Sequence, residues 1–397
     1  MAIHESFLEP KVHLSDDPYW LIHRFFFVVL RYRITKFFLS VLLLASTVII
    51  ILQTLIILET FNGIYFINYF MMYIGSILVW FTTYSIPQTK NFVTSGIRDL
   101  HRWDIKSAGP VVEKSIRKTA LYEISFVVVN LMVAVLGAAA HAIPGKNDKD
   151  FFLALVVFER FFPTFETPLT FLYRISYFAS TLVILAPFHM TIYFSGHLRA
   201  QISMLVTCLQ NLNYGYDKMD LLKSVYDVKY QKEISRRLKF CIERHIRIYS
   251  TGTRALSTLR NYIMLYSVGG AMFGIGVVLY GVTFQSGIQG NYLRFFCMSS
   301  SFFLTFLHSI WMGQMTQDVT SPMFDALQQT GWYYWNNRNK KMFLMFLLNS
   351  RRTFRLQYSH NVTVNYQMGV SMLRSIFSML TVLAHLKNDY YLETNSH

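Results

Sequence analysis

Seven long apolar segments limit what this chain can fold into. Each is close to the length of about 20 residues that an α-helix needs to cross a membrane. They lie at residues 37–58, 64–86, 119–143, 171–194, 261–283, 293–313 and 362–386. The composition agrees, because 53% of the residues are hydrophobic and only 15% are charged, against about 25% charged in soluble domains. The sequence therefore predicts an all-α membrane protein with seven transmembrane helices.

The basic residues are distributed unevenly between the two sides of the membrane. Thirty of the 37 lysines and arginines lie in the first 36 residues or in the segments 87–118, 195–260 and 314–361, and only four lie in the segments of the opposite side. Because cytoplasmic segments carry the excess of Lys and Arg, the N-terminus is predicted to be cytoplasmic and the C-terminus extracellular. This topology accounts for the net charge of +15, so no nucleic-acid partner is expected.

Two stretches outside the spans also have helical patterns. Between residues 195 and 260, apolar residues recur every three or four positions, which predicts that the fourth and fifth spans continue as helices into the cytoplasm. Residues 332–350 are either an amphipathic helix at the membrane interface or a packing module that joins subunits. We therefore divide the chain into a cytoplasmic N-terminus with a ligand-binding bundle of six spans (1–313) and an anchor helix with a pore-lining seventh span (314–397).

The seventh span carries a continuous polar face. At steps of three or four residues, this face holds Ser371, Ser375, Ser378, Val382 and Leu386, with His385 beside them. A polar face must turn away from lipid, toward protein or water. Serine hydroxyls can replace part of an ion's hydration, and a ring of apolar side chains can close a path by dewetting. The pattern indicates a gated pore; alternatively, the serines hold neighbouring helices together by hydrogen bonds.

Four other spans carry small, hydroxyl-bearing or aromatic residues at a similar depth. Small residues leave space, aromatic rings line it and a few polar groups orient a ligand, which is the usual composition of a pocket for a small apolar molecule. Each such residue is also typical of ordinary helix packing. Because the four sets fall in the outward half of the membrane, we expect one pocket there. The candidate ligand-binding residues are Tyr69, Tyr73, Gly137, His141, Tyr173, Tyr177, Ser180, Thr181, Ser301 and Phe302.

The C-terminal end carries a recognisable motif. The run Ser-Met-Leu-Thr-Val-Leu-Ala-His-Leu-Lys at residues 378–387 follows a Trp332/Trp335 region and a basic linker. It resembles the closing segment of insect odorant receptors and of their shared co-receptor. Seven spans, an internal N-terminus, short outer loops and the length of 397 residues are also similar to that family. The compact fourth loop lacks the long insertion that marks the co-receptor, so the chain resembles an odour-tuning subunit.

The resemblance implies a tetrameric cation channel in which the seventh helix of each subunit lines a central pore. It implies a small volatile odorant as the ligand, co-receptor subunits as partners in a hetero-oligomer, and the plasma membrane of a sensory neuron dendrite as the location. In the co-receptor, a valine and a leucine four residues apart form the outer gate. Val382 and Leu386 match these two residues, and His385 stands where the co-receptor has a glutamine.

Other functions are open at the level of the sequence. The related gustatory receptors are the closest alternative, although this chain lacks their closing Thr-Tyr, five residues, Gln-Phe pattern. A multi-pass enzyme would need clustered catalytic or metal-binding groups, but His141, His189 and His308 lie on three different spans. A transporter is often built from internal repeats, and none is evident. No catalytic residue, metal site or cofactor is predicted.

Overall fold

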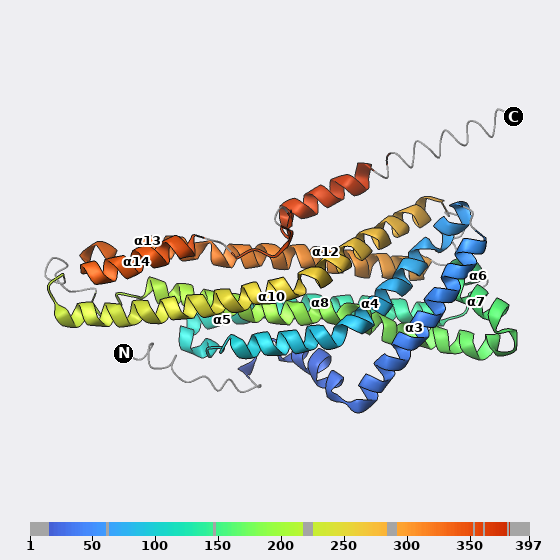
Figure 1. Cartoon of the computed structure of the whole chain (residues 1–397), viewed down its shortest axis with the longest axis horizontal. Helices are drawn as coiled ribbons and strands as arrows, with labels where there is room; N and C mark the ends of the chain where they lie inside the picture. Colours follow the sequence, from blue (N-terminus) through green and yellow to red (C-terminus); the bar gives the residue numbers. More distant parts are fainter. Residues whose placement is uncertain are drawn as a thin grey trace.

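The computed structural model describes residues 16–60, 63–145, 148–216, 225–283, 292–351, 354–359, 362–378 and 381. Its long helices run side by side along the length of the molecule, and the last helix, over residues 366–378, leaves this bundle (Figure 1). The long helices are α3 (Arg33–Glu59), α4 (Gly63–Asp99), α5 (Pro110–Ala142), α8 (Glu166–Gln210), α10 (Val228–Thr283) and α12 (Tyr292–Thr320). The predicted all-α architecture is confirmed.

Shorter elements precede, connect and follow the long helices. The short helical elements are α2 (Trp20–Ile22), η2 (His23–Val28), η3 (Val29–Arg31), η4 (Ile105–Ala108), α6 (Asp148–Phe151), α7 (Leu153–Phe161), η5 (Pro163–Phe165), α13 (Pro322–Gln328), η6 (Trp332–Tyr334) and α14 (Asn337–Ser350). The strands β1 (Gln357–Ser359) and β2 (Val362–Thr363) pair in antiparallel fashion, with Gln357 opposite Thr363. This small sheet directly precedes the last helix.

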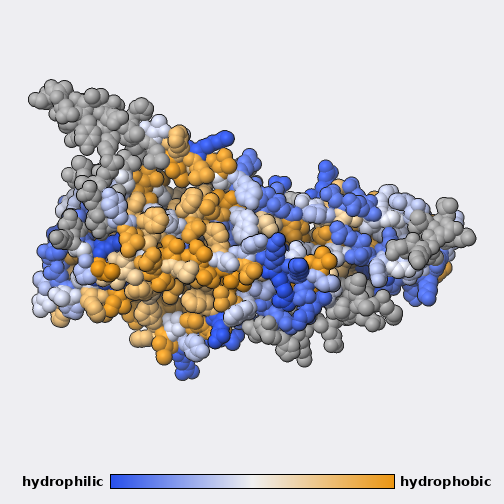
Figure 2. Space-filling view, turned by 180° about the vertical axis from the view of Figure 1, so that it is seen from behind, coloured by the Kyte–Doolittle hydropathy of each residue, from blue (hydrophilic) through white to orange (hydrophobic). Residues whose placement is uncertain are grey.

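Six helices in the described part of the chain are long and apolar enough to cross a membrane, and they correspond to the first six predicted spans. On the face shown in Figure 2, a broad hydrophobic belt crosses this part of the molecule, with hydrophilic surface at either end. The predicted seventh span is described only up to residue 378 and at residue 381. Its predicted start at residue 362 is wrong, because β2 occupies that position and the helix begins at residue 366.

The predicted helical extensions are present. The 45 residues of α8 and the 56 residues of α10 exceed the roughly 20 residues that cross a membrane. The predicted helix over residues 332–350 is instead η6 followed by α14, and Asn336 caps α14 by accepting a hydrogen bond from the Asn339 N–H. The Asn339 side-chain amide donates to the Gln231 carbonyl at 2.9 Å, which holds α14 against the extension of α10.

A buried ion pair fixes three long helices relative to one another. Glu123 of α5 pairs with Arg199 of α8, and Arg199 also donates to Thr316 Oγ1 of α12 at 3.3 Å. All three side chains are buried. Removing one partner of a buried pair leaves the other charge uncompensated, which is strongly destabilising. This contact therefore sets the alignment of the helices that carry most of the predicted ligand-binding residues.

Candidate ligand-binding site

A partly open cavity of about 1670 Å³ lies among the helices of the bundle. Small-molecule sites usually have volumes of roughly 300–1,000 Å³, so this cavity has room for an odorant-sized molecule and more. Its walls come from α3, α4, α5, α8, α10, α12 and the last helix. Eight of the ten predicted ligand-binding residues line it, namely Gly137, His141, Tyr173, Tyr177, Ser180, Thr181, Ser301 and Phe302.

Aromatic rings surround the end of the cavity nearest α6 and α7. His141 of α5 stacks on Tyr177 of α8, with ring centroids 4.9 Å apart. Tyr177 packs edge-on against Tyr173 at 5.2 Å. Phe152 lies 5.7 Å from the His141 ring, and Phe158 lies 5.8 Å from the Tyr173 ring. Such edge-to-face and offset contacts are the favoured arrangements of aromatic pairs, so this end of the cavity has a well-defined shape.

Sequence reasoning missed Phe158, which also lines the cavity. This residue belongs to the connection between two spans, where no pocket residue was expected. A signal is nevertheless present, because eight apolar residues in a row occupy positions 151–158. Loops seldom carry such runs, since surface connections are normally polar and exposed. In the structure the run is almost entirely buried, and it closes the α6–α7 end of the bundle.

Tyr69 and Tyr73 of α4 are the two predicted residues that do not line the cavity. The Tyr69 hydroxyl donates to the Lys149 carbonyl at 2.8 Å. The Tyr73 hydroxyl lies 2.8 Å from Thr54 Oγ1 of α3. These two side chains therefore join α4 to the α5–α8 connection and to α3.

Few polar atoms project into the cavity, and most are already hydrogen-bonded. The Tyr177 hydroxyl donates to the Tyr173 hydroxyl at 2.9 Å. Ser301 donates to the Asn130 amide oxygen at 2.8 Å, and the Asn130 amide nitrogen donates to Thr305 Oγ1 at 2.9 Å. These last contacts join α5 to α12 deep in the bundle. A ligand in this space would mainly meet apolar and aromatic surface.

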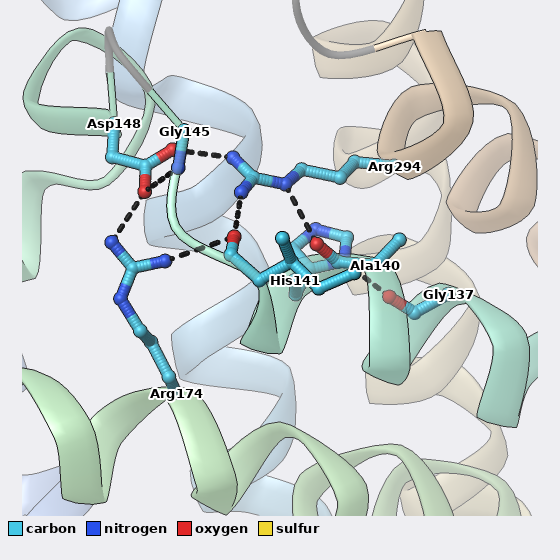
Figure 3. Close-up of polar contacts among 8 residues, drawn as sticks. Gly137, Ala140, His141, Gly145, Asp148, Arg174 and Arg294 are labelled. Atoms are coloured by element: carbon cyan, nitrogen blue, oxygen red, sulfur yellow. Dashed lines mark hydrogen bonds and ion pairs between the residues drawn. The ribbon is translucent and has the colours of Figure 1, made fainter.

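A cluster of charged residues holds the α5–α8 connection across the end of the cavity (Figure 3). Asp148 of α6 pairs with Arg294 of α12 and with Arg174 of α8. Both arginines also donate to the Ile143 carbonyl, and the Gly145 N–H donates to Asp148 at 2.8 Å. Four segments of the chain therefore meet at one carboxylate. We refer to Asp148, Arg174 and Arg294 as the outer clamp.

The electrostatics of the outer clamp favour the ionised carboxylate. Burial raises the pKa of Asp148, but hydrogen bonds from Arg294, the Gly145 N–H and Arg174 outweigh burial and hold the pKa below its usual value of 3.8. Gly145 is suited to this position because a Cβ there would lie 2.7 Å from Asp148 Oδ1. Hydrogen bonds to an ionised group are also stronger than neutral ones.

The last helix borders the same cavity, and its predicted pore residues fall into three groups. Ser371 and Ser375 line the cavity, and their hydroxyls donate to backbone carbonyls one turn earlier. Ser378 is exposed at the end of the continuously described helix. The two predicted gate residues, Val382 and Leu386, and the predicted pore residue His385 lie outside the described residues.

The described residues contain no group of three or more His, Cys, Asp or Glu side chains that could hold a metal ion. The three cysteines are all free thiols. The polar groups of the cavity are hydroxyls, amides and one imidazole, which suit hydrogen bonding to a small molecule.

Comparison with known proteins identifies the family. Residues 117–377 match the family model of the 7tm odorant receptor. The insect olfactory receptor OR5 from Machilis hrabei has a similar structure, with a TM-score of 0.65 and 10% identity over 87% of each chain. The structure of the same receptor in complex with eugenol is also similar, with a TM-score of 0.65 and 11% sequence identity. This match covers 86% of the present chain and 88% of the receptor from Machilis hrabei. No curated protein sequence matches the chain.

The family match covers well over half of the 397 residues. The structural similarity, at low sequence identity, shows that the two chains share an all-helical fold. The chain therefore belongs to the 7tm odorant receptor family, and it is a receptor rather than an enzyme, as the sequence predicts.

Proposed function

We propose that this receptor binds a small, mostly apolar odorant in the cavity and that binding opens a cation pore lined by the last helix. One observation supports this above all. The same cavity is bordered by His141 and Tyr177 at its α6–α7 end and by Ser371 and Ser375 of the last helix. A ligand that changes the shape of the cavity can therefore shift the helix on which the predicted pore face lies, with no relay through distant parts of the fold.

The chemistry of the cavity supports an apolar volatile ligand. Its walls are mainly aliphatic and aromatic side chains, with a few hydroxyl groups, the composition that suits small organic molecules. The structurally similar receptor from Machilis hrabei has been determined in complex with eugenol, a small aromatic compound. We infer that this chain takes ligands of comparable size, and that the outer clamp keeps the end of the cavity closed around them.

The surroundings of the last helix support assembly with other subunits. Gly369 lies against Ile310 of α12, but Leu373 and Phe377 are 46% and 71% exposed in the single chain, and Ser371 and Ser375 are exposed as well. When a transmembrane helix exposes both an apolar and a polar face, lipid can cover the apolar face, but the polar face needs contact with another protein chain or with water. Together with the resemblance to an odour-tuning subunit, this favours a hetero-oligomer with the co-receptor, with a tetramer as the expected form.

The proposed orientation places the N-terminus in the cytoplasm and the α6–α7 end outside the cell, in the plasma membrane. The distribution of basic residues supports it. The chain's Asn-Val-Thr sequon begins at Asn361 and would then face the cytoplasm, where it should carry no glycan. Epitope tags test the orientation directly: a C-terminal tag should be stained on intact cells and an N-terminal tag only after permeabilisation. The opposite staining pattern would reverse the topology.

The channel function is tested by recording odour-evoked currents from cells that express the chain with and without the co-receptor. If Val382 and Leu386 close the pore by excluding water, a serine at either position should favour the open state and raise the basal current. Leu380→Ser is the matched control for Val382→Ser, because residues two positions apart fall on nearly opposite sides of a helix with about 3.6 residues per turn. Equal effects of Val382→Ser and Leu380→Ser would refute the assigned pore face. His385→Gln should instead alter ion selectivity.

A further inference from the structure

His141 presents one hydrogen-bonding atom that has no partner among the described residues. Its ring nitrogen Nδ1 lies 2.7 Å from the Gly137 carbonyl oxygen (Figure 3). A carbonyl oxygen only accepts hydrogen bonds, so Nδ1 must carry the proton. In a neutral imidazole the other nitrogen is then an acceptor. That atom, Nε2, is buried and makes no hydrogen bond with any other described residue.

The surroundings of His141 fix the ring and favour its neutral form. The side chain is 4% exposed, and it is held between the ring of Tyr177 and the edge of Phe152. Arg294 donates to the carbonyl of Ala140, the neighbouring residue, at 2.9 Å, and Asp148 already pairs with both clamp arginines. A second buried cation beside Arg294 would lack a counter-ion of its own, and an unpaired buried charge is very costly. The Nε2 lone pair is therefore available.

The position of this acceptor makes it relevant to ligand binding, because His141 lines the cavity. Buried polar atoms in native proteins are nearly always hydrogen-bonded. In the structure Nε2 is enclosed by its neighbours, although His141 lines the cavity, so a donor on a bound molecule reaches this atom when the aromatic rings packed around His141 move apart. The hydroxyl of Tyr177, whose ring stacks on His141, donates to the Tyr173 hydroxyl instead.

We propose that His141 Nε2 accepts a hydrogen bond from a ligand hydroxyl, and that this receptor therefore selects alcohols or phenols over ethers and esters with the same carbon skeleton. The proposal rests on the proposed function, because it assigns the ligand class of the same cavity. Ethers and esters have hydrogen-bond acceptors but no donor, so they would leave Nε2 unpaired. Their oxygen lone pairs would also be repelled by the lone pair of Nε2. Volatile amines are disfavoured as cations by the adjacent Arg294.

The test uses matched pairs of odorants in cells that express the receptor with the co-receptor. The pairs are benzyl alcohol with benzyl methyl ether, hexanol with hexyl methyl ether, and eugenol with its methyl ether. For the wild type, the half-maximal concentration should be lower for the hydroxyl compound by about tenfold or more, the effect of one hydrogen bond to a buried acceptor. His141→Phe keeps an aromatic ring but loses the acceptor. In this variant the ratio of the half-maximal concentration of the ether to that of the hydroxyl compound should fall to about one. His141→Gln retains an acceptor and should restore part of the preference.

Tyr73→Phe is the control variant, because it removes a hydroxyl outside the cavity and should leave the ratio unchanged. The wild-type ratio needs no variant, so a poorly expressed His141→Phe protein does not weaken the test. If the methyl ethers are as potent as the hydroxyl compounds on the wild type, or if His141→Phe keeps the preference, the role of His141 is refuted while the cavity still binds odorants. If no volatile compound of any class activates or binds the receptor, the proposed function fails as well.

Discussion

Asp148 and Arg294 form an ion pair at the end of the cavity, with Asp148 Oδ1 2.5 Å from Arg294 Nη1. The two side chains are 5% and 7% exposed, and the Arg294 guanidinium also lies over the Phe152 ring at 5.4 Å from its centroid. The pair joins α6 to α12, while Arg174 adds α8. The connection between α5 and α8 is therefore held over the cavity by paired charges as well as by its apolar run.

Replacing Asp148 by asparagine should destabilise the receptor strongly. The amide removes the negative charge and leaves Arg294 buried without a counter-ion, which typically costs about 3–5 kcal/mol. Thermal unfolding of the purified protein in detergent measures the loss. Glu159→Gln is the matched control, because Glu159 pairs with Lys149 at 2.9 Å but both side chains are about half exposed; it should cost less than about 1 kcal/mol. Similar losses in the two variants would mean that the outer clamp does not stabilise the fold.

The contribution of Asp148 to the stability of the folded receptor should depend on pH only under acidic conditions. Its pKa in the folded receptor is below the ordinary value of 3.8. A group whose folded pKa is lowered contributes stability that is fully present above the unfolded pKa and is lost as pH falls through the folded pKa. The difference in melting temperature between wild type and Asp148→Asn should therefore be constant near neutral pH and shrink below 3.8. A difference that already closes between pH 7 and 5 would contradict this assignment.

The six described spans could be predicted because long apolar runs have few alternatives to crossing a membrane as helices. The start of the seventh could not be placed in the same way. Val362, Thr363 and Val364 are as apolar on average as a span, but β-branched residues also favour strands. In the structure the first two form β2, and Val364 N–H donates to the Leu356 carbonyl at 2.8 Å. Hydropathy alone does not distinguish these two outcomes.

The cavity was predictable where its residues follow helical spacing within single spans, as for Tyr173, Tyr177 and Ser180 of α8. The outer clamp was not, because it depends on three helices meeting at Asp148, a loop residue in the sequence. Tyr69 and Tyr73 have the right spacing and the right chemistry for a pocket. Their hydroxyls nevertheless point to partners on other segments, which no pattern within α4 reveals.

Filling the cavity at Ser180 should change which odorants the receptor accepts. Ser180 lines the cavity, and Ser180→Leu adds side-chain volume there. Overpacking costs about 1–3 kcal/mol, or about one to two decades in concentration, so sensitivity to bulky ligands should fall more than sensitivity to small ones. Concentration–response curves with the co-receptor measure the shift. Tyr73→Phe lies outside the cavity and should leave the rank order unchanged; an unchanged order in Ser180→Leu too would place the ligand elsewhere.

The exposed face of α14 should mediate contacts between subunits. Leu344, Met345 and Leu348 fall on one side of this helix and are 50%, 70% and 73% exposed. Figure 1 places α14 at the opposite end of the long helices from α6 and α7, away from the hydrophobic belt. An apolar patch that faces water rather than lipid indicates a protein interface, which favours the packing module over the membrane-interface helix.

Two substitutions on this face test that interpretation. Met345→Glu combined with Leu348→Glu places two like charges in the expected contact, so less receptor should co-purify with the co-receptor while the melting temperature of the single chain stays nearly the same. Like charges in an interface oppose association because they must be desolvated without partners. Gln328→Glu combined with Gln329→Glu adds the same charge at two exposed positions after the buried part of α13 and should co-purify normally. If both double variants assemble as well as the wild type, the subunits do not meet through α14, and its apolar face has to be covered in another way.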